Sequence, residues 1–196
     1  MKGSRAAVTA LCALAALAAG CASSPLSRYY TLSSTVAPAA PASRFSVAVG
    51  PVRVPALVDR PQIVVSVGDN EVRLEEFHRW AAPLQEDLSR VIAENLIAAL
   101  GTQRVSVFPH SAGADYRVAV EVQRFESVPG TSATVDAAWS VRRTKDGREE
   151  RGRSSVREPV QNAGFEALAA AHSRAAGRLA QDIADVIRRL EKPQLP

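Results

Sequence analysis

Cysteine is scarce in this sequence: the 196 residues include two, Cys12 and Cys21, and both lie near the start of the chain. The remaining chain therefore has no cysteine pair for a disulfide, no thiolates for a zinc site and no thiol nucleophile. A domain formed by that part must derive its stability from an apolar core. The chain is long enough to bury one such core.

Long apolar runs are also lacking. The stretch from Ala6 to Ala19 is interrupted by Thr9, and it is shorter than the roughly 20 apolar residues that a membrane-spanning helix needs. Lys2 and Arg5 precede it and small residues follow it, which is the order of regions in a secretory signal peptide. We therefore predict that residues 1–20 are a signal peptide and are removed.

Cys21 directly follows the small residues Ala18, Ala19 and Gly20. This arrangement is typical of a bacterial lipobox, in which the chain is cut before the cysteine and fatty acids such as palmitate are attached to it. Plain secretion with cleavage at an A-x-A site and an ordinary buried thiol are the alternatives. We favour lipidation of Cys21. Several acyl chains make a stable anchor, since each buried CH2 contributes about 0.8 kcal/mol.

The sequence has no large excess of one charge sign. Lysine and arginine number 24 and aspartate and glutamate 20, which gives a net charge of +4. Loss of Lys2 and Arg5 with the signal peptide lowers this charge to +2. Arginine and glutamate are interspersed along most of the chain, so the sequence does not indicate a nucleic-acid partner.

Familiar catalytic motifs are missing as well: the sequence contains no G-x-S-x-G, no P-loop and no G-x-G-x-x-G. Three histidines lie apart from other metal-ligand types at the usual spacing: His78, His110 and His172. Paired carboxylates beside arginines or on helix faces are interpreted as solvated surface charge: Glu75-Glu76, Glu86-Asp87 and Glu149-Glu150. We therefore predict a protein that is not an enzyme and that holds no metal or cofactor.

Serine, threonine, alanine and proline dominate residues 21–43, and we interpret this segment as a lipidated tether. Two adjacent aromatic residues, Tyr29 and Tyr30, are unexpected in a free linker, so we expect them to dock on the domain as an edge strand and count them among the candidate interface residues. The stretch TVAPAAPAS after them is predicted to be an extended linker that lets the domain reach away from the membrane. Residues 44–192 form the single expected domain.

Apolar periodicity predicts strands and two helices in this domain. Alternation indicates strands within 45–55, 61–77, 104–108, 115–128, 132–143 and 148–158, with a hairpin turn at Gly68-Asp69-Asn70. Apolar faces at helical spacing indicate helices at 83–100 and 163–191. On the first helix the expected solvent side carries Glu86, Asp87, Arg90 and Glu94. The predicted fold class is α+β, a two-layer domain in which a mostly antiparallel sheet has two helices packed on one face.

The stretch from residue 57 to 88 carries the candidate interface residues. Trp80 stands just before the first helix and has two interpretations: it packs the helix start against the sheet, or it lies with His78 and Arg79 at a subunit contact, where tryptophan and arginine are favoured. Arg60 and Pro61 are either the start of a strand or part of the same contact. Both interpretations predict a binding module.

The sequence resembles a known family at several of these places. The lipobox, RYYTL shortly after it, VDRPQIV, and HRWAAPL leading into VIAENLIAALG are similar to the ABC-transport auxiliary lipoproteins of the PqiC kind, which accompany MCE-domain lipid transporters in Gram-negative envelopes. The resemblance extends from Cys21 to the last helix. Two positions depart from the family pattern: Val65-Ser66 replace a common Thr-Arg pair, and Ala82 replaces a common Glu.

The resemblance implies a function. Such a protein is expected to be an α+β lipoprotein that its acyl chains hold at the inner leaflet of the outer membrane. It is expected to bind a periplasm-spanning MCE tunnel protein and its inner-membrane transporter subunits, and to form a homo-oligomer. Ala22-Ser23 after the cysteine include no aspartate at the position that retains lipoproteins in the inner membrane of enterobacteria, which favours the outer membrane. The alternative function is an envelope assembly lipoprotein or an activator of a cell-wall synthase.

Overall fold

The computed structural model describes residues 25–40, 43–109 and 113–192. The predicted signal peptide and Cys21 lie outside these residues. The elements along the chain are β1 (Arg28–Tyr30), β2 (Val47–Arg53), β3 (Gln62–Ser66), β4 (Val72–Trp80), α2 (Leu84–Leu100), β5 (Val105–Val107), β6 (Tyr116–Val128), β7 (Ser132–Arg143), β8 (Glu149–Pro159) and α3 (Phe165–Glu191). Among the described helices, none combines the length and the apolar character that crossing a membrane requires.

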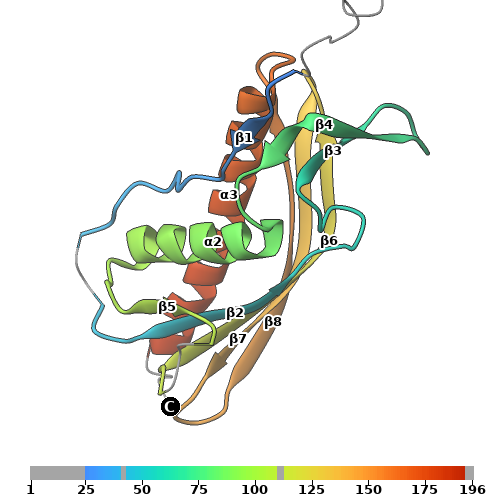
Figure 1. The fold of residues 1–196 in the computed structure, drawn as a ribbon. Coiled ribbons are helices and arrows are strands. Elements are labelled where there is room, and N and C mark those ends of the chain that lie inside the picture. Colours follow the sequence, from blue (N-terminus) through green and yellow to red (C-terminus); the bar gives the residue numbers. More distant parts are fainter. Residues whose placement is uncertain (1–24, 41–42, 110–112, 193–196) are drawn as a thin grey trace, which may run out of the picture.

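The helices lie on one side of a long curved sheet (Figure 1). This sheet has five described strands in the order β5-β2-β6-β7-β8. Helix α3 runs along β7 and β8, while α2 crosses α3 and covers β2. The prediction of an α+β domain with two helices packed on a sheet is confirmed.

The sheet arrangement differs from the expected one in two ways. A second sheet, in the order β1-β4-β3, is separate from the first, and both sheets are mixed because β2 is parallel to β5 and β6 and β1 is parallel to β4. Alternating apolar residues indicate a strand and its buried face, but they are the same in parallel and antiparallel strands. The sequence pattern therefore could not distinguish these pairings.

The central strands follow the predicted alternation. On β6, Tyr116, Val118, Val120 and Val122 are buried, whereas Arg117 and Glu121 are exposed. Strand β8 is polar and forms an edge of the five-stranded sheet, as predicted. Helix α2 ends at Gly101, whose φ of 63° is in the left-handed region that a glycine adopts without a steric penalty. The apolar faces of both helices join these strands in one core.

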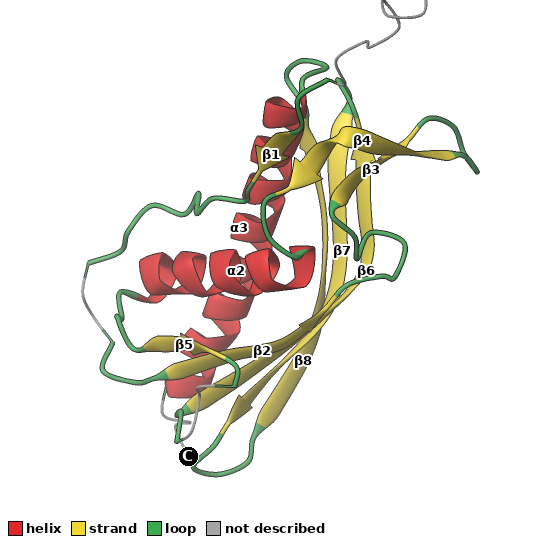
Figure 2. Ribbon diagram, viewed as in Figure 1, coloured by secondary structure: helices red, strands yellow, loops and turns green. Residues whose placement is uncertain are grey.

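Strands β3 and β4 form the predicted hairpin around Gly68-Asp69-Asn70. The hairpin projects beyond the edge of the main body (Figure 2). Its base is anchored in the core by Ile63 and Val65, which are fully buried. Its outer part is exposed, with Val67, Val72 and Leu74 among the accessible large apolar residues.

Residues 31–40, which we call the strap, pass over both helices. Leu32 in the strap is 1% exposed, its backbone N–H donates to Asp87 on α2 at 2.7 Å, and Ala39 N–H donates to Ala98 O at 2.8 Å. Part of the stretch TVAPAAPAS, which we predicted to be an extended linker, is therefore held on the helices, as Thr35, Val36 and Ala39 show. The backbone N–H groups of the strap donate hydrogen bonds to side chains of α2 that lie more than fifty residues away in the sequence. The composition of the strap itself does not reveal these partners.

Candidate functional site

The seven candidate interface residues of the domain converge on the three-stranded sheet. Arg28, Tyr29 and Tyr30 of β1 pair in register with His78, Arg79 and Trp80 of β4. On the other side of β4, Trp80 N–H donates to Pro61 O at 2.7 Å, with Arg60 directly before it. The prediction that Tyr29 and Tyr30 dock as an edge strand is confirmed.

One face of this sheet is accessible. Tyr29, Arg79 and Gln62 occupy one register position across β1, β4 and β3, and therefore share a face. Tyr29 is 63% exposed, and Phe77, two residues before Arg79, is 41% exposed. We call Tyr29, Gln62, Phe77 and Arg79 the outer platform. It combines two exposed aromatic side chains with a half-exposed guanidinium, a composition suited to an interface.

The opposite face of the sheet packs inward. The His78 ring stacks on Phe165 of α3 with centroids 3.9 Å apart, and Tyr30 Oη lies 2.8 Å from His78 Nδ1. Trp80 is 4% exposed and contacts Phe125 and His172 edge to face. Of the two interpretations of Trp80, packing agrees with this burial. The packing partners are on β6 and α3, whereas the sequence pointed to the start of the helix that follows.

His172 completes this aromatic cluster from α3. Its ring is fully buried and stacks on Phe125 at 3.9 Å, and its Nε2 lies 2.8 Å from Ser127 Oγ. Its Nδ1 has no hydrogen-bond partner among the described residues. Burial lowers the pKa of the imidazole to about 3, so the native protein holds this histidine in its neutral form.

We predict that this histidine makes the protein sensitive to acid. Below pH 6.5 the unfolded chain binds a proton at His172 that the native state does not bind, so the free energy of unfolding falls by about 1.4 kcal/mol per pH unit until about pH 3. Urea unfolding at pH 6.5 and pH 4.5 should show a loss of about 2.5 kcal/mol. The His172→Phe variant keeps the stacking and should lose this slope. An equal slope in the variant would contradict the assignment.

The hairpin and the loop before it enclose a groove of about 410 Å³. Leu57 and Val58 line one side, Val64 and Val72 line the hairpin side, and Phe125 lies at its base in β6. Two accessible side chains here are aliphatic, with Leu57 49% and Val72 44% exposed, and polar residues such as Glu71 and Arg124 complete the lining. We call this feature the hairpin groove. A groove that combines exposed aliphatic side chains with a polar rim is suited to a protein partner.

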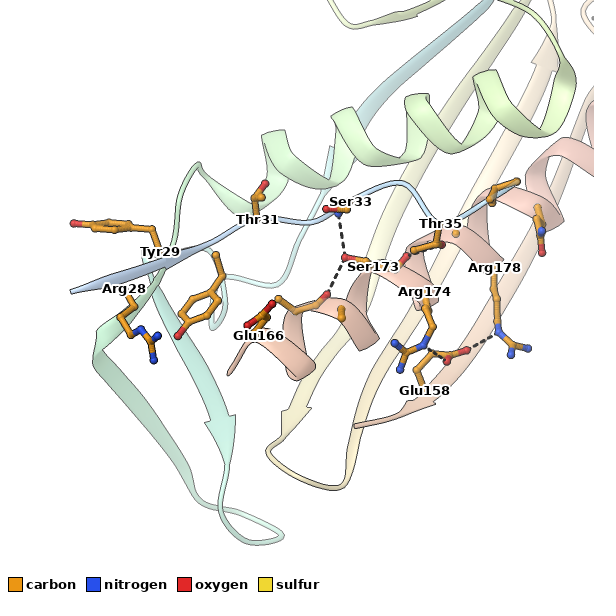
Figure 3. A pocket seen from close by; sticks show the side chains of 16 residues that line it. Arg28, Tyr29, Thr31, Ser33, Thr35, Glu158, Glu166, Ser173, Arg174 and Arg178 are labelled. Carbon is orange, nitrogen blue, oxygen red and sulfur yellow. Dashed lines mark hydrogen bonds and ion pairs between the residues drawn. The ribbon is translucent and has the colours of Figure 1, made fainter. Parts of the chain in front are cut away.

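A larger groove, of about 1090 Å³, lies between α3 and the strap (Figure 3). Small residues of α3 such as Ala170, Ser173 and Gly177 line it. On its rim the carboxylate of Glu158 is buried and contacts Arg174 at 2.9 Å and Arg178 at 2.5 Å. The two guanidinium groups outnumber the one carboxylate, and these ion pairs hold β8 to α3 beside the groove.

The residues that fix the strap were missed by the sequence analysis. Asp87 was expected on the solvent side of its helix, yet it is 3% exposed and accepts hydrogen bonds from the strap. Asn95 is fully buried and accepts from the N–H groups of Thr35 and Val36, both at 3.0 Å. The one signal in the sequence was an asparagine on the apolar face of α2, because a buried amide needs hydrogen-bond partners.

The described residues do not bring together a group of three or more His, Cys, Asp or Glu side chains that could hold a metal. His78 and His172 lie in separate aromatic contacts, and His110 lies outside the described residues. The prediction that the protein has no catalytic activity stays a prediction.

Comparisons with known proteins agree with this fold. A family described as the ABC-type transport auxiliary lipoprotein component matches residues 30–184. Two crystal structures are similar. One, of an uncharacterized protein, has a TM-score of 0.69 and 19% identity, and the match covers 83% of this chain and 99% of that one. The other, of protein XCC0632 from Xanthomonas campestris, has a TM-score of 0.68 and 21% identity, and the match covers 82% of this chain and 94% of that one. No curated protein sequence matches the chain.

Proposed function

Because this chain belongs to the ABC-type transport auxiliary lipoproteins, we propose that it is the lipid-anchored accessory subunit of an MCE-type lipid transporter. In this proposal Cys21 is acylated and holds the domain at the outer membrane, facing the periplasm. The domain docks on the periplasm-spanning MCE protein and so connects the inner-membrane transporter to the anchor. It performs no catalysis, and copies of it associate with one another around the lipid path.

The observation that carries the docking role is the exposed apolar surface of the hairpin, beside the hairpin groove. Val72 and Leu74 are exposed on a hairpin that projects from the body, and an edge hairpin with accessible apolar side chains is prone to aggregate unless a partner covers it. Leu57 continues the apolar surface across the groove. We assign this surface to the MCE partner.

The test is capture of the tagged protein from detergent-solubilised membranes, followed by identification and mass measurement of the complex. We expect an MCE protein and its permease to copurify, and we expect Val72→Glu with Leu74→Glu to lower their yield at least tenfold. Both side chains are accessible in the isolated domain, so the substitutions should leave its unfolding transition unchanged.

Lys145→Glu is the matched control. Lys145 is exposed in the turn between β7 and β8, away from the hairpin, and its substitution changes the net charge by the same two units. It should leave the capture unchanged. Recovery of a cell-wall synthase in place of transporter subunits would refute the transport proposal and favour the alternative function. Equal loss in both variants would refute the hairpin groove as the contact.

A further inference from the structure

The docked strap changes how far the domain can reach from its anchor. From β1 onward the chain is fixed to the body, first by pairing with β4 and then by the hydrogen bonds of the strap to α2. Only the residues from Cys21 to Ser27, which we call the leash, remain between the acylated position and β1. Even fully extended, seven residues span about 25 Å. The same calculation on the whole predicted tether would give about 75 Å.

The end of the body nearest this leash carries the outer platform. β1, which begins directly after the leash, contributes Tyr29, and the adjacent strand β4 contributes Phe77 and Arg79. Leu26, two residues before β1, is 91% exposed. In Figure 1 this end lies opposite the turn between β7 and β8. A short leash therefore brings one particular surface, with exposed aromatic and basic side chains, to within a few residues of the acyl chains.

We propose that the outer platform rests on the lipid surface, so that the domain is held against the bilayer in a fixed orientation. This inference rests on the proposed lipidation of Cys21. Tyrosine side chains favour the headgroup level of a bilayer, where the ring is partly buried and the hydroxyl stays in water. The guanidinium group of Arg79 lies on the strand next to Tyr29 and on the same face, and it can reach the phosphates of anionic lipids while its stem covers apolar surface.

This orientation fits the position of the hairpin groove. β1, which follows the leash in the chain, is one edge of the small sheet, whereas the hairpin tip projects from the body on the β3 side (Figure 2). The hairpin tip therefore lies on the side of the small sheet away from the strand that the leash enters, where a protein in the periplasm can approach it.

The experiment measures the distance of two labels from the bilayer in the full lipidated protein. After loss of the signal peptide Cys21 is the one native cysteine, so Gln62→Cys on the platform and Lys145→Cys on the β7–β8 turn can each carry a single bimane fluorophore. The proteins are reconstituted in vesicles of phosphatidylethanolamine and phosphatidylglycerol (3:1) that contain a headgroup nitroxide quencher. We expect the label at position 62 to be quenched at least threefold more strongly than the label at position 145.

A second pair of variants separates the platform from the leash. Tyr29→Ser with Phe77→Ser, added to the position 62 label, should reduce the quenching at least twofold, since both side chains are exposed and the leash alone does not fix the orientation. Phe108→Ser removes an exposed aromatic side chain after β5, outside the platform, and should leave the quenching unchanged. Unequal folding is checked by far-UV circular dichroism.

Flotation of the labelled proteins with the vesicles reports the anchor independently of the orientation. If the proteins float and copurify with transporter subunits but both labels are quenched equally, the orientation is wrong while the proposed function stands. The orientation is also wrong if Tyr29→Ser with Phe77→Ser changes nothing, or if position 62 crosslinks to a second copy of the chain instead. If the proteins do not float, both the anchor and the orientation are overturned.

Discussion

Replacement of Asp87 and Asn95 together by alanine is expected to release the strap and to lower the free energy of unfolding by about 4 kcal/mol. Asp87 accepts the N–H of Leu32 at 2.7 Å in a buried position, and its loss leaves that N–H without a partner. Asn95 accepts three strap donors, the N–H groups of Thr35 and Val36 and the hydroxyl of Ser34, each at 3.0 Å. Unsatisfied buried groups of this kind cost about 1–3 kcal/mol each.

The two substitutions should not add. Loss of either side chain alone is expected to detach part of the strap, which also breaks some hydrogen bonds of the other side chain. The double variant should therefore lose less stability than the sum of the losses in the single variants. Urea unfolding followed by the fluorescence of Trp80 and Trp139 measures the stability. Chymotrypsin cleavage after Leu32, which is 1% exposed in the native protein, should accelerate at least tenfold and reports the strap directly.

Glu86→Gln is the control for this prediction. Glu86 and Asp87 both lie in the first turn of α2, where a negative charge interacts favourably with the helix dipole. Glu86 is exposed, so its substitution removes a similar dipole interaction at the surface and should cost under about 0.5 kcal/mol. If the control variant and the double variant lose equal stability, the contacts of the strap do not contribute to stability. The conclusion that only residues 21–27 separate the anchor from the body would then be wrong.

A second large effect is expected at Gly152 in β8. Gly152 pairs with Trp139 of β7, and a Cβ at this glycine would overlap the indole ring. The ring is held in place because its Nε1–H donates to Ser154 Oγ at 3.0 Å, and that hydroxyl in turn donates to Asp182 on α3. Displacement of the indole would therefore also disturb the contact between β8 and α3.

We expect Gly152→Val to lower the free energy of unfolding by about 3 kcal/mol. The sign of this change in the free energy of unfolding is informative. Valine favours strands and would stabilise β8 if the indole ring of Trp139 did not occupy the space next to Gly152. Gly68→Ala is the control: its Cβ would lie 3.9 Å from the nearest atom, at Glu71, and its effect on stability should stay within about 0.5 kcal/mol. A neutral or stabilising Gly152→Val would contradict the close packing of Trp139. Thermal and urea unfolding by circular dichroism measure both variants.

The pattern of the sequence predicted the elements of the fold well, for a local reason. The helix predicted at 83–100 is found at Leu84–Leu100, and the helix predicted at 163–191 is found at Phe165–Glu191. The hairpin turn at Gly68-Asp69-Asn70 and the polar edge strand β8 are also where the sequence indicated. Each of these features depends on side chains within a few residues of one another, so periodicity and turn chemistry are enough to specify them.

The site residues were predicted only in part. The sequence singled out Tyr29, Arg79 and Trp80 but could not tell which were accessible. The structure exposes Tyr29 and buries Trp80 between β6 and α3. Neighbouring residues on a strand point to opposite faces, so the division between an outer platform and an inner aromatic cluster depended on which face the helices cover.

What the sequence by itself determined is the set of strands and helices, most of their buried faces and the α+β class, while acylation of Cys21 stays a prediction. Only the tertiary structure decided that the strands form two mixed sheets and that Asp87 and Asn95 hold residues 31–40. The physical reason is that those outcomes depend on hydrogen bonds between groups more than fifty residues apart. A donor and an acceptor at such a separation leave no periodic signal, and an aspartate on a helix is expected to be solvated until its partner in the fold is known.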